Sequence, residues 1–338
     1  MNKYSNKTVL VTGATGLIGS HIVDKLMSYG DVKVIALSRS EKKLKTGFAE
    51  YNESDMFKMV AQDICNPIQI QEPIDYIFHA AGPMEGKIIR EYPVDVINPN
   101  IIGTINCLEF LKKQNKMINR DGRLILFSSV TVYGNNTNND ITVDETLTNI
   151  TEYLESVSAP YSQSKRMSEV ITLAYIKQYS IDAVICRFST VYGSTRFIPD
   201  TAFFEFISKA INGDNIILNS SDLPRRDNIY IDDAVEGVLL VGTDGNIGEA
   251  YNISSNGDFD NYASVDEIAK YIISCVREDY GKRNIELIYK NNVSTKRKTG
   301  LKLDNKKVKA LGWNINYSLK KGIKETLEDI INRQVYEM

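Results

Sequence analysis

Two side chains near the middle of the chain have the types and spacing that suit proton transfer. Tyr161 and Lys165 are four residues apart, so on a helix they lie on one face. A tyrosine with an ordinary pKa of about 10 is a poor base at neutral pH. An ammonium group beside it stabilises the phenolate, so we expect Lys165 to lower the pKa of Tyr161 and to make proton transfer feasible.

A hydroxyl group upstream could complete this pair. The segment Ser128-Ser129-Val130-Thr131-Val132-Tyr133-Gly134 follows the apolar run Leu124 to Phe127, which has the pattern of a strand buried on both faces. Ligands of open α/β sheets bind at the carboxyl ends of the strands. A serine there can hydrogen-bond the reacting oxygen of a sugar or ketone.

A glycine-rich loop near the N-terminus has the features of a dinucleotide site. Thr12-Gly13-Ala14-Thr15-Gly16-Leu17-Ile18-Gly19 follows an apolar run at 7–12 and opens a helix expected over 17–29. Glycines permit a sharp turn and a close approach of a pyrophosphate, and the helix N-terminus offers free N–H groups. We therefore expect a set of cofactor-binding residues here: Gly13, Thr15, Gly16, Leu17, Ile18 and Gly19.

The end of the second expected strand indicates which cofactor is bound. NAD sites often place an acidic residue there to hold the ribose 2′-hydroxyl. This chain has Ser38 and Arg39 instead, which can hydrogen-bond and charge-pair a 2′-phosphate. We therefore favour NADP(H). In the alternative, Arg39 stacks on the adenine and NAD(H) is used.

Strand-like and helix-like segments alternate through the first half of the chain, which predicts a doubly wound, Rossmann-like parallel sheet with helices on both faces. Strands are expected at 32–37, 58–62, 75–80, 123–128 and 181–188, and helices at 96–117 and 159–179. After residue 189 we expect helices at 201–212, 264–277 and 319–332, with short strands between them. This predicts a dinucleotide-binding domain over 1–190 and a smaller mixed α/β substrate region over 191–338 that crosses back to the sheet.

Composition excludes several classes of protein. The 338 residues carry 40 Lys and Arg against 43 Asp and Glu, so no strongly basic surface for a nucleic-acid polymer is expected. Two histidines exclude a His-rich metal site, and we expect no metal. The four cysteines are far apart and are expected to be reduced. With no apolar N-terminal signal and no run of about 18 apolar residues, we expect a cytoplasmic protein that does not enter a membrane.

Taken together, these motifs resemble the extended short-chain dehydrogenases/reductases of the NAD-dependent epimerase/dehydratase family, which act on nucleotide sugars. The resemblance runs through nearly the whole chain and includes Arg187 to Gly193, Arg226 to Asp233 and Leu311-Gly312-Trp313. It implies Ser129, rather than Ser128, as the catalytic partner of Tyr161 and Lys165, with Lys165 also reaching the nicotinamide ribose. Further implied cofactor contacts are Asp63, Ile64, Ala80, Ala81, Gly82, Asn100 and Phe188. Implied substrate contacts are Met84, Thr131, Thr190 and Arg226, the last on the sugar diphosphate.

Departures from the family pattern narrow the expected reaction. The family's 4,6-dehydratases carry Asp-Glu, and a decarboxylase group Ser-Glu, directly after the catalytic residue, whereas this chain has Val130 and Thr131. Without a carboxylate to protonate a departing hydroxyl, dehydration is disfavoured, and decarboxylation less firmly so. A non-catalytic NADP(H) sensor is disfavoured because it should lack the Tyr and Lys pair.

Two reactions that share one hydride step remain. A ketosugar reductase takes up fresh NADPH at each turnover, whereas a C4-epimerase retains its NAD and returns the hydride to the other face of the sugar. Ser38 and Arg39 favour the reductase, as does Thr190, where epimerases often carry Asn. We expect an NADPH-dependent reductase of an NDP-4-keto-(6-deoxy)hexose in surface-glycan biosynthesis. The resemblance also implies a homodimer that packs the helices at 96–117 and 159–179 of each copy.

Overall fold

The computed structural model describes residues 2–83, 86–118, 121–134, 140–147, 154–199, 201–220, 224–281, 284–290 and 300–336. Its largest element is a seven-stranded parallel sheet with the order β11-β7-β5-β4-β1-β2-β3. The strands are β1 (Thr8–Thr12), β2 (Lys33–Ser38), β3 (Phe57–Ala61), β4 (Tyr76–His79), β5 (Arg123–Ser129), β7 (Asp182–Phe188) and β11 (Ala250–Ile253). This order is that of a Rossmann-like fold, which confirms the predicted fold class.

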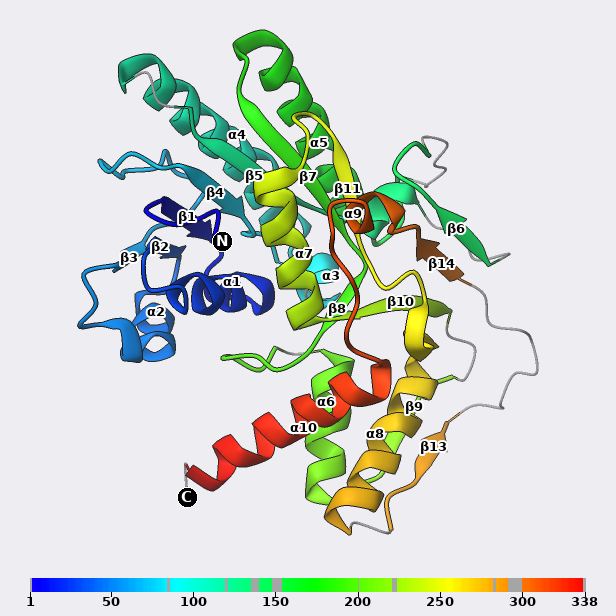
Figure 1. Ribbon diagram of the computed structural model, residues 1–338. Coiled ribbons are helices and arrows are strands. Elements are labelled where there is room, and N and C mark those ends of the chain that lie inside the picture. Colours follow the sequence, from blue (N-terminus) through cyan, green and yellow to red (C-terminus); the bar gives the residue numbers. More distant parts are fainter. Residues whose placement is uncertain are drawn as a thin grey trace.

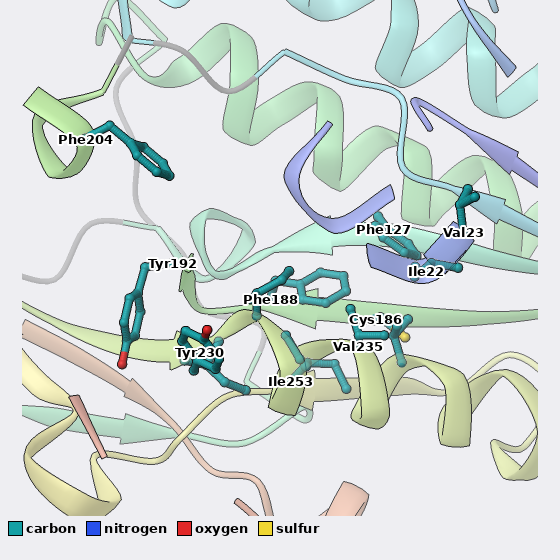
Figure 2. Packing of buried hydrophobic residues seen from close by; sticks show 14 of the residues in the cluster. Ile22, Val23, Phe127, Cys186, Phe188, Tyr192, Phe204, Tyr230, Val235 and Ile253 are labelled. Carbon is teal, nitrogen blue, oxygen red and sulfur yellow. The ribbon is translucent and has the colours of Figure 1, made fainter. Parts of the chain in front are cut away.

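Helices cover both faces of this sheet (Figure 1). Successive strand residues point to opposite faces, so Val9 and Val11 pack into one hydrophobic core while Leu10 packs into the other. The first core is covered by α1 (Leu17–Met27) and α7 (Ile231–Asp244), and the second by α4 (Pro93–Ile118) and α5 (Ala159–Tyr179). In the first core, Cys186, Val235 and Ile253 lie close together beneath the sheet (Figure 2). The central strands are therefore apolar over most of their length, as the run Leu124 to Phe127 predicted, whereas Lys58 of β3 and Arg187 of β7 are charged.

The sequence interpretation missed helix α7, where it expected only short strands. The helix is buried over most of its surface, and its exposed residues, Asp232 and Glu236, form only a narrow polar stripe. Two glycines allow this close packing. A Cβ on Gly242 would lie 2.4 Å from the Tyr4 hydroxyl, and one on Gly237 would lie 3.2 Å from Trp313 Nε1.

The later part of the chain forms a second layer and also returns to the large sheet. A five-stranded sheet has the path β12-β10-β14-β6 with β8 on β10, and a two-stranded sheet pairs β13 with β9. The strands of these two smaller sheets are β6 (Ile141–Val143), β8 (Thr190–Tyr192), β9 (Ile216–Leu218), β10 (Arg225–Tyr230), β12 (Tyr262–Ser264), β13 (Leu287–Tyr289) and β14 (Gly300–Leu303). Strand β11 leaves this region and pairs with β7. The domain boundary at residue 190 stays a prediction.

Three longer helices pack beside these smaller sheets, at the bottom of Figure 1: α6 (Ala202–Asn212), α8 (Val265–Tyr280) and α10 (Leu319–Tyr336). The remaining helices are α2 (Glu41–Gly47), α3 (Gly86–Glu91) and α9 (Lys306–Lys309), with 3₁₀ turns η1 (Ala49–Tyr51), η2 (Val130–Tyr133) and η3 (Asp258–Asp260). None of the described helices has the length and apolar composition that a membrane crossing requires.

Candidate active site

The glycine-rich loop joins β1 to α1 and is packed too tightly for side chains. Gly13 has a φ of +65°, and a Cβ there would lie 2.7 Å from the Ala81 nitrogen. A Cβ on Gly19 would lie 2.4 Å from the Gly13 carbonyl oxygen. Helix α1 begins after Gly16, and no described side chain caps its N-terminus. Its first N–H groups, including those of Leu17 and Ile18, are therefore available to an anion.

The other predicted cofactor residues lie along the same carboxyl edge of the sheet. Ser38 ends β2, and its hydroxyl lies 2.8 Å from that of Thr15, while Arg39 just beyond is exposed. Asp63 follows β3 and accepts a hydrogen bond from the Cys65 N–H, and the Ile64 side chain is buried. Ala80, Ala81 and Gly82 follow β4, and the Ala81 N–H donates to the Thr12 hydroxyl at 3.3 Å.

Helix α5 brings two of the three predicted catalytic residues to the end of β5. The helix begins at Ala159, where Pro160 in the first turn loses no hydrogen bond, and it continues without a break to Tyr179. The Ser129 side chain, at the end of β5, hydrogen-bonds the Tyr161 hydroxyl. Lys165 Nζ lies 5.9 Å from the centre of the Tyr161 ring and donates to the Phe127 carbonyl oxygen at 2.8 Å. The structure thus places Ser129, Tyr161 and Lys165 together.

Burial sets the pKa values of Tyr161 and Lys165. Desolvation raises the pKa of Tyr161 to about 12, and the hydrogen bond from Ser129 lowers it only in part. Desolvation also lowers the pKa of Lys165 to about 8, against the attraction of Glu169. The expectation that Lys165 lowers the pKa of Tyr161 is therefore wrong, because burial raises the pKa of Tyr161 instead.

The buried side-chain amide of Asn100 lies beside these three residues and fits a bound dinucleotide. Asn100 in α4 donates to the Ser164 hydroxyl at 2.9 Å, which ties α4 to α5. Its Oδ1 atom is buried and has no hydrogen-bond partner among the residues that the structure describes. A Cβ on Gly82 would lie 2.6 Å from that oxygen and 3.4 Å from Lys165 Nζ. A glycine-lined edge that ends at an unpaired polar atom and a buried ammonium suits the phosphates and ribose of a dinucleotide.

The predicted substrate residues are distributed over three elements. The Thr131 hydroxyl, in η2, donates to Ser129 Oγ at 3.1 Å. Thr190 begins β8 and pairs in register with Asn228 of β10. Phe188, a predicted cofactor contact, packs its ring 4.9 Å from that of Phe127. Met84 lies outside the described residues.

Arg226 in β10 has an electrostatic setting that differs from that of its neighbour. Arg225 forms a two-pronged ion pair with Glu267, at 2.8 and 3.1 Å. Arg226 has no ion pair within the described ranges, and its side chain is exposed. Surrounding protein nevertheless lowers the pKa of its guanidinium by desolvation. Such a cation is available to an anionic ligand.

One charged residue of the site escaped the sequence interpretation. Glu169 lies one turn beyond Lys165 on the same buried face of α5 and forms an ion pair with Arg187. The spacing of four residues from Tyr161 to Lys165 continues to Glu169, and an acidic residue on an otherwise buried helix face is the signal that could have found it.

Comparisons with known proteins place this geometry in a family. Residues 9–254 match the model of the NAD dependent epimerase/dehydratase family. The chain is 28% identical over 327 residues to UDP-glucuronic acid decarboxylase 6 of Arabidopsis thaliana, covering 96% of this chain and 89% of that protein. It is 28% identical over 337 residues to dTDP-D-glucose 4,6-dehydratase of Homo sapiens, covering 95% and 89%.

Solved structures agree with this relationship. UDP-glucuronic acid 4-epimerase from Bacillus cereus, in complex with UDP-glucuronic acid and NAD, has a TM-score of 0.77 at 26% identity, with 97% of this chain and 100% of that chain covered. The chain therefore belongs to the NAD dependent epimerase/dehydratase family, which confirms the resemblance seen in the sequence. The roles of individual site residues stay predictions.

The glycine loop can be tested by ligand-induced stabilisation. We expect Gly13→Ala to abolish the rise in Tm on adding NAD(H) or NADP(H), because the new Cβ would collide with the chain at Ala81. Gly30→Ala is the matched control, since Gly30 also has a positive φ but its Cβ would contact nothing within 4 Å. Its Tm should fall while the ligand-induced rise persists. Equal ligand-induced shifts in both variants would contradict a cofactor at this loop.

Proposed function

We propose that this protein is a nucleotide-sugar oxidoreductase that reduces the C4 ketone of an NDP-4-keto-(6-deoxy)hexose with NADPH. The observation that carries the proposal is the buried cluster of Ser129, Tyr161 and Lys165 beside the glycine-lined edge of the sheet. The relatives named above act, by name, on UDP- or dTDP-linked sugars. Surface-glycan biosynthesis would use such a product.

In this reaction the chain's own residues handle the proton and the orientation of the sugar. NADPH bound along the glycine-rich loop would supply a hydride to the ketone carbon. The hydroxyls of Ser129 and Tyr161 hydrogen-bond the C4 oxygen, and Tyr161 donates its proton as that oxygen gains charge. A neutral Tyr161 with a raised pKa is in the correct protonation state for an acid. Lys165 holds a positive charge nearby, and Arg226 is the proposed partner of the diphosphate.

The residues after Ser129 favour redox chemistry over elimination. The described contacts of Ser129 on this side come from Thr131, a hydroxyl that cannot replace a carboxylate as a proton donor to a leaving hydroxyl. Dehydratase or decarboxylase activity is therefore not proposed, although relatives carry those names. C4 epimerisation is the second candidate, because the Bacillus cereus epimerase resembles this chain along nearly its whole length.

Cofactor stoichiometry separates the two candidates. Purified protein is mixed with NADPH and a panel of UDP- and dTDP-linked 4-keto-6-deoxyhexoses and hexoses, and absorbance at the reduced nicotinamide band is followed. A reductase consumes one NADPH for each sugar reduced. Epimerisation with no net cofactor consumption would overturn the reductase and support the second candidate, and binding without turnover of any sugar would favour a sensor.

Replacing the proton donor tests the catalytic role of Tyr161. We expect Tyr161→Phe to lower kcat by about 100-fold or more, because the C4 oxygen loses its acid. Tyr192→Phe is the control, since the hydroxyl of this buried tyrosine donates, within the described part of the chain, to the backbone carbonyls of residues 318 and 319. Its kcat should stay within about twofold of wild type. Near-normal turnover by Tyr161→Phe would show that another group donates the proton.

The proposed preference for NADP(H) over NAD(H) depends on Ser38 and Arg39 at the end of β2. We expect Arg39→Ala to raise KM for NADPH by about tenfold or more and to leave KM for NADH within about twofold, because a charge-assisted contact to the 2′-phosphate is lost. Lys45→Ala removes a cation from the neighbouring helix α2 that already pairs with Glu41, and both KM values should stay unchanged. An equal effect of Arg39→Ala on both cofactors would point to NAD(H).

The pKa of Lys165 predicts how the reaction responds to pH. Its ammonium is present below about pH 8 in the free protein and is lost as the pH rises through that value. Because kcat/KM reports ionisations of the free enzyme, kcat/KM for sugar reduction should fall above about pH 8. Lys165→Arg, which stays charged, should lose this fall. A kcat/KM that increases from pH 7 to 10 would contradict a required ammonium.

We also propose a homodimer through α4 and α5. In α4, Leu108 and Leu111 are buried against the sheet and cannot form a dimer contact. Other apolar side chains on the outer surface are exposed, among them Met117, Met167, Val170 and Leu173. We expect a solution mass of roughly twice 38.1 kDa, reduced to the monomer value by Val170→Glu but not by Ile247→Glu. A monomeric wild-type protein in light scattering would exclude the dimer.

A further inference from the structure

A buried ion pair lies directly beneath the proposed catalytic residues. Arg187 of β7 donates to both carboxylate oxygens of Glu169 in α5, from Nε at 3.0 Å and from Nη2 at 2.8 Å. The side chains are only 14% and 8% exposed. Pairs of this kind contribute little net stability, because desolvating two charges offsets their attraction. The location of the pair therefore calls for another explanation than stability.

The pair joins α5, the helix that carries Tyr161, to β7, which is the neighbour of the strand β5 that carries Ser129. Ser128, directly before Ser129, donates its hydroxyl proton to Glu169 Oε1. Ser128 also stands opposite Arg187 in the register of β5 and β7. Together with the hydrogen bond from Lys165 to the Phe127 carbonyl, this makes two successive ties between α5 and the end of β5.

The same arginine reaches the loop after Ser129 and the later part of the chain. Arg187 Nη1 donates to the Tyr133 hydroxyl at 2.8 Å, and Tyr133 ends the η2 turn that begins after Ser129. The Tyr133 hydroxyl donates to Asn252 Oδ1 in β11, also at 2.8 Å. Asn252 Nδ2 donates to the Asp304 carbonyl oxygen at 3.0 Å. The pair thus fixes both sides of Ser129 and connects them to the substrate region.

We propose that Glu169 and Arg187 are positioning residues for proton transfer: they hold Ser129 against Tyr161 and provide the anionic neighbour that keeps Lys165 protonated. This inference rests on the proposed function of the Ser129, Tyr161 and Lys165 cluster. Neither residue of the pair is proposed to touch substrate or cofactor. Their effect on the reaction passes through the three residues that do.

The charges around Lys165 support the second half of this role. Its titratable neighbours in the described part of the chain are Tyr161 and Glu169 on its own helix and His79 at the end of β4. Burial lowers the pKa of His79 to about 3, so His79 is neutral, and Tyr161 is neutral as well. Glu169 is the anion that raises the pKa of Lys165. Removing its charge would also leave the Arg187 cation unbalanced nearby.

The first test needs no substrate. In the ligand-free protein, the pH dependence of Lys165 acetylation, followed by mass spectrometry of labelled peptides, gives the titration midpoint of this lysine. We expect Glu169→Gln to lower that midpoint by about one pH unit or more, since an opposite charge within reach shifts a pKa by about 1–3 units. An unchanged midpoint would overturn the charge role.

The matched control lies at the other end of the same two strands. Arg123 and Asp182 pair in register there, with Nε and Oδ1 2.8 Å apart and side chains 15% and 28% exposed. Asp182→Asn therefore removes a comparable charge far from the carboxyl edge. We expect a loss of Tm similar to that of Glu169→Gln, with no change in the Lys165 midpoint or in kcat.

The second test measures turnover, and it includes a milder variant in case Glu169→Gln does not fold. Glu169→Gln should lower kcat at least tenfold, with both KM values within about twofold of wild type. Ser128→Ala keeps the ion pair and removes only the hydrogen bond from the Ser128 hydroxyl to Glu169, so it should lower kcat by about threefold to tenfold. If Glu169→Gln does not fold, Ser128→Ala alone decides the positioning role. Wild-type kcat in Ser128→Ala, or parallel losses in Asp182→Asn, would overturn it. If the wild-type protein is inactive, that result counts against the proposed function. The acetylation measurement would still test whether Glu169 keeps Lys165 protonated.

Discussion

The contact between helix α5 and the end of strand β5 is the constraint on which the rest of the site depends. Lys165 reaches across to the Phe127 carbonyl, and Ser129 meets the Tyr161 hydroxyl two residues further along the strand. All strands of the large sheet are parallel, so their carboxyl ends lie at one edge. The loop after β4 therefore approaches the same point, and Gly82 leaves just enough room for Lys165 and Asn100.

Burial has opposite consequences for the two titratable groups of this cluster. The same desolvation that keeps Tyr161 neutral makes the Lys165 ammonium less stable. A neutral tyrosine suits proton donation to a ketone, whereas a charged lysine is needed to stabilise the tyrosinate that remains. The carboxylate of Glu169 counteracts part of the loss, and Arg187 balances its charge without contacting Lys165 in the described hydrogen bonds. The site thus depends on three neighbouring buried charges of alternating sign, those of Lys165, Glu169 and Arg187.

Much of this arrangement could be predicted from the sequence, because local patterns determine it. The glycine loop, the apolar strands and helix 159–179 follow from spacing alone, and the structure has that helix at the predicted residues. Helix α7 was not recognised, although Asp232 and Glu236, its exposed residues, have the spacing of one helix face. The pKa values of Tyr161 and Lys165 depend on how deeply the helix packs, which a spacing of four residues does not specify. The partnership of Glu169 with Arg187 joins two elements whose register only the fold sets.

The most direct test of the account is the fate of the hydride. NADPH deuterated at the transferable position of its nicotinamide C4 is incubated with the protein and an NDP-4-keto-6-deoxyhexose that it turns over, and the product is examined by NMR. If Ser129, Tyr161 and Lys165 surround a C4 carbonyl, the deuterium appears at C4 of the sugar and nowhere else. A product with deuterium at another carbon, or with a solvent-derived hydrogen at C4, would contradict the assignment of this cluster as the site of C4 redox chemistry.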